Sequence, residues 1–220
     1  SEGFVPEKTM HALKSESFTA VHGVPSMFSA MLASSEFNGK PIKSLRTGIM
    51  AGSQCPEVLM RRVLYDLGCS EITIAYGMTE TSPISFQSDV NDPVDVRVST
   101  VGRIQPHCEV KIVEDDGSTC AIGQTGELWT KGYLVMKGYW NDTEATQSSI
   151  ENGWMKTGDL ATIDNEGFCR IVGRKKDMVI RGGENIYPAE LEEFLTAQKG
   201  ILEAHVFGIP DEKFGEQLVA

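Results

Sequence analysis

The sequence lacks the spaced cysteines and histidines from which disulfide frameworks and zinc sites are built. Its five cysteines are odd in number and scattered without a C-x-x-C pair, and its four histidines are equally dispersed. This spacing indicates neither a disulfide scaffold nor a zinc site, and it favours a reducing compartment.

Long apolar runs and a surplus of basic charge are missing as well. No stretch approaches the roughly 20 apolar residues that a membrane-spanning helix requires. Because 31 Asp and Glu outnumber 20 Lys and Arg, the net charge is −11. A negative surface repels nucleic-acid phosphates and anionic lipids, so we expect neither as a partner. A phosphate-bearing ligand would have to be met by a few local residues.

What is present is the composition of a folded globular protein: 220 residues, 40% of them apolar, which can bury a sizeable core. The chain opens at Ser1 and stops inside the apolar run at 218–220, so we expect it to be a piece of a longer protein. Targeting and oligomeric state are not readable from such a piece.

The first hundred residues alternate short apolar runs with helical patterns. This rhythm predicts parallel βα units, whose ligands bind at the carboxyl ends of the strands. Strands are expected at 18–21, 45–51 and 72–75, and helices at 25–34 and 56–67, with Pro56 at a first helical position.

The pattern changes near Val101, where short strands stand between Gly, Asp and Asn turns. This predicts an antiparallel, barrel-like sheet. Its strands are expected at 110–113, 127–130, 161–163 and 168–172, with a hairpin loop at 164–167 between the last two.

A third pattern begins after Gly173 with a charged run and a glycine-rich loop at 180–185. A helix opening at Pro188 and capped by Gly200 follows, and then a strand at 204–209. We therefore predict a mixed α/β chain with a domain boundary near Gly173. The predicted domains are residues 1–173 and 174–220.

The segment with the clearest chemistry is YGMTETSP at 76–83, directly after the third expected strand. A glycine lets the backbone approach a ligand closely, and the hydroxyl of Thr79 can meet a phosphate oxygen. The carboxylate of Glu80 offers a hard oxygen to Mg²⁺. Taken alone, the segment also fits an ordinary strand-to-loop turn with a solvated glutamate.

Two further segments carry polar groups. In Thr157-Gly158-Asp159, a carboxylate after a tight turn can accept both hydroxyls of a ribose, although the tripeptide also fits an ordinary turn. In the stretch from GRKKD to RGGENIYP at 173–188, an arginine can meet ribose or phosphate and a glycine loop can line a narrow tunnel. The alternative for this stretch is a solvated charged linker.

The order and spacing of these segments resemble the adenylate-forming superfamily of acyl-CoA synthetases, luciferases and peptide-synthetase adenylation domains. YGMTETSP is similar to its magnesium and phosphate motif, WMKTGD to its ribose motif, and GRKKDMVIRGGENIYPAELE to its hinge and the start of its small domain. AGSQCP takes the place of the adenine-contacting turn, and GELWTKGYLVMKGYW matches another family stretch. The resemblance covers essentially the whole chain and is strongest to medium-chain acyl-CoA synthetases.

The resemblance implies a fold and a reaction. The fold is the C-terminal part of the large adenylate-forming domain, with parallel βα units and a barrel-like sheet, followed by the start of the small α+β C-terminal domain. The reaction joins a carboxylic acid to ATP with Mg²⁺, giving an acyl-adenylate and pyrophosphate, and CoA as co-substrate then displaces AMP. Resemblance to the medium-chain enzymes further suggests the mitochondrial matrix.

The resemblance also assigns roles in nucleotide binding. Thr79 would contact the α-phosphate and Glu80 would hold Mg²⁺. Asp159 would accept the ribose hydroxyls, and Arg174 would contact the ribose side of the nucleotide. The residues implied around the adenine and phosphates are Gly52, Ser53, Gln54, Tyr76 and Gly77.

Further roles concern the acid, CoA and domain movement. Lys176 falls at the hinge position, where relatives carry Asp or Lys. Gly183 and Glu184 would approach the pantetheine tunnel. The acyl pocket would be lined by His22, Gly23, Val24 and Met78, together with Gly77, although His22 is equally readable as an ordinary packed histidine.

Two family elements have no counterpart in the sequence: the Ser/Thr- and glycine-rich phosphate loop and the catalytic C-terminal lysine. We therefore expect the chain on its own to be inactive. Two alternatives to an acid–CoA ligase stay open, namely a ligase that uses a carrier-protein thiol or an amine as acceptor, and a non-catalytic nucleotide-binding paralogue. The second is disfavoured because Thr79, Glu80, Asp159 and Arg174 keep chemically competent side chains.

Overall fold

The computed structural model describes residues 3–196, 198–201 and 204–220. The chain divides into two compact units, residues 1–108 and 109–220, which are described separately. The domain boundary after residue 173 stays a prediction. Within the described residues, no helix has both the length and the apolar character that a membrane crossing requires.

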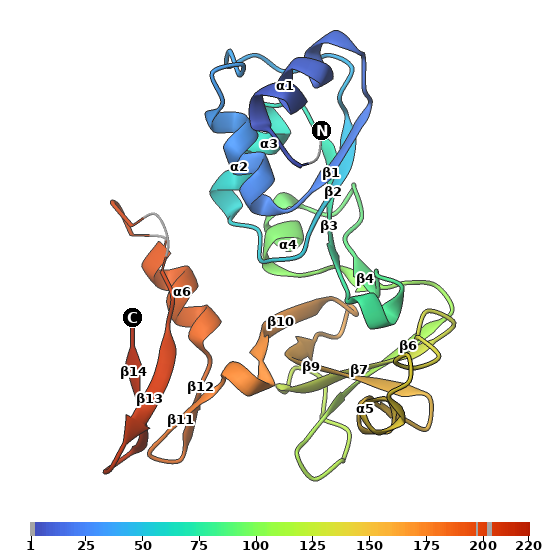
Figure 1. The fold of residues 1–220 in the computed structure, drawn as a ribbon, viewed down its shortest axis with the longest axis vertical. Coiled ribbons are helices and arrows are strands. Elements are labelled where there is room, and N and C mark those ends of the chain that lie inside the picture. The colour runs from blue at the N-terminus through green and yellow to red at the C-terminus, as the bar shows by residue number, and fades with distance from the viewer. Residues whose placement is uncertain (1–2, 197, 202–203) are drawn as a thin grey trace. The chain divides into compact units, whose positions relative to one another are not determined.

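The first unit is built around a five-stranded sheet with the order β1-β2-β3-β4-β5 (Figure 1). The first three strands run parallel, and β4 and β5 are antiparallel additions. The strands are β1 (Ala20–Gly23), β2 (Thr47–Ala51), β3 (Glu71–Tyr76), β4 (Phe86–Gln87) and β5 (Arg103–Ile104). The predicted parallel βα rhythm is therefore present, with each predicted strand shifted by one or two residues.

Helices α1, α2 and α3 gather along one side of the parallel strands (Figure 1). The helices of this unit are α1 (Pro6–Ser15), α2 (Pro25–Ala33), α3 (Glu57–Tyr65) and α4 (Val94–Ser99), and a 3₁₀ turn η1 covers Thr79–Thr81. One continuous core joins Met10 of α1, Phe28 of α2 and Met60 of α3 to Ile72 of β3, all fully buried.

Helix α3 shows how the sequence pattern produces this packing. Met60, Val63, Leu64 and Leu67 recur at the spacing of one helical face and are buried. Pro56 occupies the N-cap position with extended backbone instead of the predicted first helical position. The opposite face carries exposed ion pairs such as Glu57–Arg61, at 2.7 Å, which contribute little to stability.

The second unit contains a sheet with the order β10-β9-β7-β6, to which β8 adds beside β9. Its strands are β6 (Cys108–Val113), β7 (Gly126–Gly132), β8 (Ile150–Glu151), β9 (Trp154–Ile163) and β10 (Cys169–Arg174), and α5 (Thr143–Ser149) precedes β8. Strands β9 and β10 form the predicted hairpin, whose loop is held by the Asp164 carboxylate accepting from the N–H groups of Glu166 and Phe168. Strand β9 begins seven residues earlier than the predicted 161–163, which places Thr157–Asp159 inside a strand.

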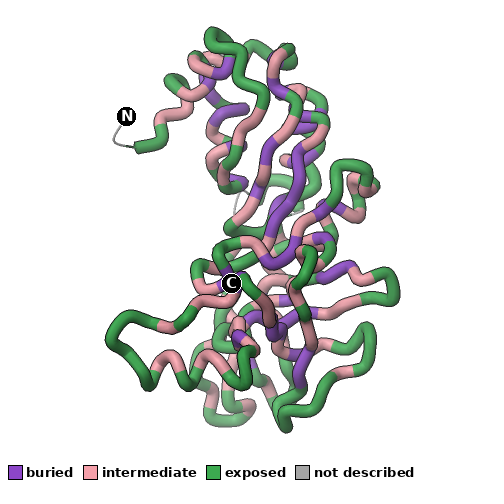
Figure 2. The backbone as a smooth tube through the Cα atoms, turned by 90° about the vertical axis from the view of Figure 1, so that its right-hand side faces the viewer, coloured by how far each residue is buried: buried purple, intermediate pink, exposed green. Residues whose placement is uncertain are grey.

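A smaller four-stranded sheet, with the order β12-β11-β14-β13, completes the second unit. Its elements are η2 (Lys175–Asp177), β11 (Val179–Arg181), β12 (Glu184–Ile186), α6 (Pro188–Thr196), β13 (Phe207–Asp211) and β14 (Gly215–Val219). The prediction of a glycine-rich loop over 180–185 is wrong. Only its two glycines form a turn, and its other residues belong to the paired strands β11 and β12. Helix α6 ends at Thr196, before the predicted cap Gly200. In Figure 2, buried residues (purple) occur on helices as well as on strands.

Lysines and tryptophans alternate on one face of the β6–β7–β9 strands. The ammonium of Lys111 lies 4.5 Å from the ring centre of Trp129 and 4.7 Å from that of Trp154. Lys156 and Lys131 cover the same two rings at 5.0 and 5.5 Å. Each cation–π contact is worth about 0.5–1 kcal/mol at a partly exposed site, so the stack stabilises the pairing of these strands.

Two substitutions on α3 test the core assignment. Met60→Ala removes a fully buried side chain and should lower the free energy of unfolding by ~2–5 kcal/mol. The matched control Val58→Ala lies on the same helix but is 73% exposed, so its effect should stay within ~0.5 kcal/mol. Urea unfolding measures both, and equal midpoints for the two variants would contradict the described core.

Candidate functional site

The carboxyl ends of β1, β2 and β3 lie side by side at one edge of the first sheet. The register pairs Gly23 with Met50 and Ala51 with Ala75, so the strands reach this edge together. The predicted acyl, adenine and phosphate residues end these strands or directly follow them. They are His22 and Gly23 at the end of β1 with Val24 after it, Gly52, Ser53 and Gln54 after β2, and Tyr76 at the end of β3 with Gly77 and Met78 after it.

Two glycines at this edge are required by close backbone approach. A Cβ on Gly77 would lie 1.7 Å from the carbonyl oxygen of Pro83, a distance that no side chain tolerates. Gly52 has a φ of +90°, and a Cβ there would come within 3.1 Å of the Val24 side chain. The turns after β1 and β2 are therefore neighbours.

The turn that carries Thr79 and Glu80 is fixed by buried hydroxyls. The Thr81 hydroxyl accepts from the Met78 N–H at 3.2 Å and donates to the Met78 carbonyl at 3.1 Å. The fully buried Ser85 hydroxyl donates to the Thr81 hydroxyl at 3.0 Å. These contacts hold the backbone of η1 in place. Thr79 is exposed to solvent, and Glu80 is half-buried. Sequence reasoning missed Thr81 and Ser85, although both are polar residues directly beside the motif.

Glu80 fits the way proteins bind Mg²⁺, which takes one or two carboxylates and completes its shell with phosphate oxygens and water. No cluster of three potential metal ligands occurs among the described residues. A single carboxylate beside an exposed threonine hydroxyl is thus suited to a metal that arrives with a phosphate ligand.

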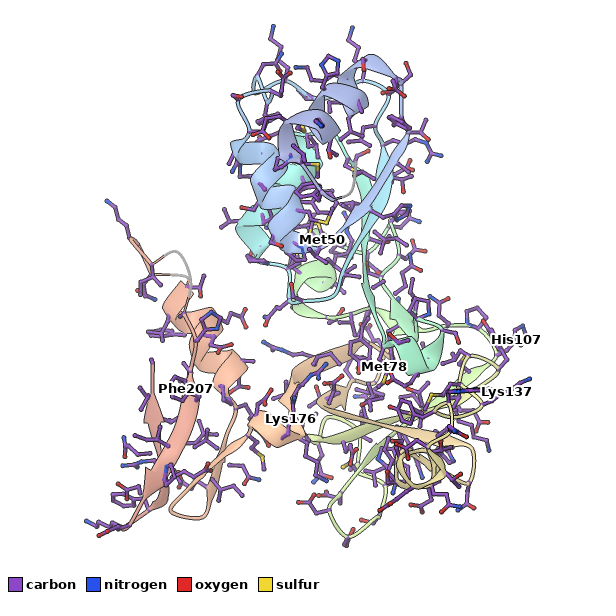
Figure 3. The ribbon with its side chains drawn as sticks, viewed as in Figure 1. Met50, Met78, His107, Lys137, Lys176 and Phe207 are labelled. Atoms are coloured by element: carbon purple, nitrogen blue, oxygen red, sulfur yellow. The ribbon has the colours of Figure 1, made fainter. Side chains whose placement is uncertain are left out.

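Other residues of this edge are exposed or half-buried. His22 is exposed among the described residues. The Tyr76 ring is half-buried and contacts Phe86, with ring centres 6.1 Å apart and planes tilted by 60°. Met78 lies just beyond β3 (Figure 3).

In the second unit, Asp159 is presented by a bulge and not by the predicted tight turn. Glu127 pairs with Leu160 and Trp129 with Lys156, so the three residues Thr157–Asp159 of β9 stand opposite Leu128 alone. Gly158 adopts a φ of +72°, which a glycine accommodates without strain. Bulges of this kind re-aim side chains next to functional sites.

The bulge turns Asp159 toward Arg174. These two residues are direct cross-strand partners of β9 and β10, and the Arg174 Nε lies 3.2 Å from the Asp159 Oδ1. The Asp159 side chain is only 8% exposed, whereas that of Arg174 is 61% exposed. The carboxylate is therefore held in place while the guanidinium remains accessible to a ligand.

An open pocket of about 380 Å³ lies beside this pair. It is lined by Thr157, Gly158, Arg174, Lys175 and Lys176. Arg174, Lys175 and Lys176 bring three cationic groups to its lining, of which Arg174 pairs with Asp159 and Lys175 pairs with Asp115 and Glu127. The arrangement suits an anionic ligand that also carries hydroxyl groups.

Lys176 lies in η2, on the segment between β10 and β11 (Figure 3). Gly183 and Glu184 lie in the hairpin that follows, where Gly182 and Gly183 form the turn with φ of +63° and +88°. Two successive positive φ values are those of the two-residue hairpin turn that glycines favour. Glu184 is an exposed residue of β12.

The cysteines do not offer a nucleophile. Burial raises the pKa of Cys55, Cys69 and Cys169 to about 12, and it also raises the pKa of Cys108 and Cys120. Thiols of raised pKa are largely protonated near neutral pH, and the thiolate is the nucleophilic form.

Comparison with known proteins agrees with the predicted family. The chain is 51% identical over 221 residues to YngI of Bacillus subtilis and 41% identical to the mitochondrial medium-chain acyl-CoA ligase ACSF2 of Bos taurus. Each match covers 99% of the chain but only 40% and 36% of the relative, so the chain spans well under half of their length.

Solved structures give the same picture. The chain matches o-succinylbenzoate CoA synthetase (MenE) of Bacillus subtilis, solved with an acyl-adenylate intermediate, at a TM-score of 0.87 and 33% identity. It matches the amide bond synthetase McbA of Marinactinospora thermotolerans at a TM-score of 0.90 and 28% identity. Both matches cover 99% of the chain, and 44% and 45% of those structures, which confirms the predicted mixed α/β adenylate-forming fold.

The family model of the AMP-binding enzymes matches residues 2–140, well over half of the sequence. The relatives found by sequence and those found by structure agree with this match. The chain belongs to the AMP-binding enzyme family.

Proposed function

We propose that the protein containing this chain is an ATP-dependent acid–CoA ligase that forms AMP. The observation that carries the proposal is the buried carboxylate of Asp159, held by a bulge next to a pocket with three cations. A nucleotide offers the complementary groups, namely ribose hydroxyls for the carboxylate and phosphates for the cations. Family membership supports the assignment of AMP and ATP as that nucleotide.

The first half-reaction would form an acyl-adenylate. A carboxylate oxygen of the acid attacks the α-phosphorus of ATP, and the bond from that phosphorus to the bridging oxygen of pyrophosphate breaks. Thr79 donates to the α-phosphate, while Asp159 and Arg174 fix the ribose. Mg²⁺ held by Glu80 would neutralise phosphate charge during this step. The chain thus acts by positioning and electrostatic stabilisation.

The adenine and the acid would occupy the edge of the first sheet. Gly52, Ser53 and Gln54 would border the adenine with Tyr76 against its ring, and Gly77 would let the phosphates approach. His22, Gly23, Val24 and Met78 would line the acyl pocket. Most of these residues are exposed, and Gly23, Tyr76 and Met78 are half-buried.

The second half-reaction would transfer the acyl group to the thiol of CoA. The thiol sulfur attacks the acyl carbon, the bond to the AMP phosphate oxygen breaks, and AMP leaves with the electron pair. Burial raises the pKa of the five thiols of this chain, which keeps them largely protonated near neutral pH. Lys176 would serve as the hinge between the two half-reactions, and Gly183 and Glu184 would approach the pantetheine arm.

A medium-chain acid is the proposed substrate, and a mitochondrial location is proposed with it. Both rest on relatives such as bovine ACSF2, at 41% identity. The alternative acceptor, an amine, is favoured by one observation, the similarity to the amide bond synthetase McbA.

The proposal is tested by assaying the intact protein with ATP, Mg²⁺, CoA and saturated acids of graded length. Pyrophosphate release together with thioester formation that peaks at a medium chain length is the expected result. Pyrophosphate release without thioester would favour the amine or carrier-thiol alternatives. If no acid gave pyrophosphate release or thioester formation, the result would favour a non-catalytic paralogue.

Glu80→Gln in the intact protein tests the magnesium assignment. The amide keeps the shape of the side chain and removes the charge, so adenylation should slow at least about tenfold, which corresponds to ~1.4 kcal/mol of barrier. Pyrophosphate release measured against Mg²⁺ concentration gives the effect. An unchanged Mg²⁺ dependence would show that Glu80 does not hold the metal.

Lys176→Pro tests the hinge assignment. Proline fixes φ near −65° and restricts rotation of the backbone, so thioester formation should be suppressed while pyrophosphate release continues. Lys176→Ala is the matched control, because it removes the charge without fixing the backbone. Parallel loss of both half-reactions in the proline variant would contradict the role of Lys176 as the pivot.

A further inference from the structure

The carboxylate of Glu127 contacts two segments that border the candidate nucleotide pocket. One oxygen, Oε1, accepts from the backbone N–H of Gly158 at 3.3 Å, and the other, Oε2, lies 3.3 Å from the ammonium of Lys175. The Glu127 side chain is only 14% exposed, whereas that of Lys175 is 42% exposed. None of the sequence motifs assigned a role to Glu127 or Lys175.

The contact with Gly158 follows from the bulge in β9. A strand that places three residues opposite one cannot pair all of their backbone groups with its neighbour. Within this bulge the Thr157 hydroxyl donates to the Leu128 carbonyl at 2.7 Å and accepts from the Asp159 N–H at 3.1 Å. The Gly158 N–H is then satisfied by Glu127, as a partly buried donor requires.

The contact with Lys175 extends to the predicted hinge. Lys175 directly follows Arg174 and precedes Lys176, and it also pairs with Asp115 at 2.9 Å. Asp115 and Glu127 together raise the pKa of the Lys175 ammonium above its usual value. The Asp115 side chain is 86% exposed, so its pairing is screened by solvent, whereas the Glu127 side chain is 14% exposed.

We propose that Glu127 is a positioning residue that links the bulge presenting Asp159 to the segment carrying Arg174 and the hinge. This role rests on the proposed function. Loss of the Glu127 acceptor frees the Gly158 amide and lets the bulge relax, which misplaces Asp159 for the ribose hydroxyls. Loss of its charge releases Lys175 and, with it, the start of the hinge segment.

Four variants separate these effects. Glu127→Ala removes both contacts, whereas Glu127→Gln keeps an oxygen for Gly158 and removes the charge that holds Lys175. Lys175→Met removes only the ammonium. Asp115→Asn is the matched control, because it weakens the exposed partner of Lys175 and leaves Glu127 intact.

The first measurement is the KM for ATP in pyrophosphate release by the intact protein. Glu127→Ala should raise it at least about tenfold with a smaller change in kcat, the effect of losing one hydrogen bond to a charged acceptor. Glu127→Gln should restore most of this loss, and Asp115→Asn should stay within about twofold. An unchanged KM in the alanine variant, or equal losses in the alanine and glutamine variants, would overturn the positioning role.

The second measurement is hydrogen exchange of backbone amides in the same proteins, which needs no turnover. The Gly158 amide should exchange faster in Glu127→Ala only, and the amides of 174–177 should exchange faster in Glu127→Ala, Glu127→Gln and Lys175→Met. Unchanged exchange at both places would overturn the proposal. If the wild-type protein released no pyrophosphate with any acid, the proposed function would fail, and the exchange data alone would decide the role of Glu127.

Discussion

Strand β9 places two extra residues opposite Leu128 of β7 and forms a bulge there. The positions of the polar residues around Asp159 depend on the geometry of this bulge. A glycine with positive φ takes up the excess length, and a threonine hydroxyl and a glutamate carboxylate receive the displaced backbone groups. The carboxylate of Asp159 is therefore held in place by the backbone of the paired strands. Its neighbour Arg174 needs no special loop, because strand register alone sets it opposite Asp159.

The first unit reaches a comparable result by different means. Parallel strands bring three turns to one edge, and steric exclusion of any side chain at Gly77 keeps the backbone close to the segment that follows. Buried hydroxyls beneath η1 replace the packing that a longer helix would supply. The rigid strands fix the positions of the turns, and the side chains of the turns remain accessible to solvent.

The sequence allowed the parallel βα order, the hairpin at Asp164 and the polar residues of the site to be predicted, because periodicity and turn residues are local signals. Helix α1 was not predicted. The short strands β4, β5 and β8 and the final strand β14 were not predicted either, since a strand depends on partners distant in sequence. The bulge at Thr157–Asp159 escaped for the same reason. A T-G-D tripeptide looks like a turn until the opposing strand is known. Likewise, Glu127 is an unremarkable residue of an expected strand, and only its position opposite Leu160 shows its contacts.

The alternation of lysine and tryptophan on the β6–β7–β9 face has a consequence for mutational tolerance. The Lys131 side chain is 41% exposed, and substitutions at such partly exposed positions usually have small effects on stability. The ring faces beneath these lysines carry negative potential, however, so an acidic side chain there would lose an attraction and meet a repulsion at once. This face should therefore accept neutral replacements and reject reversal of charge, a selectivity that solvent exposure by itself would not reveal.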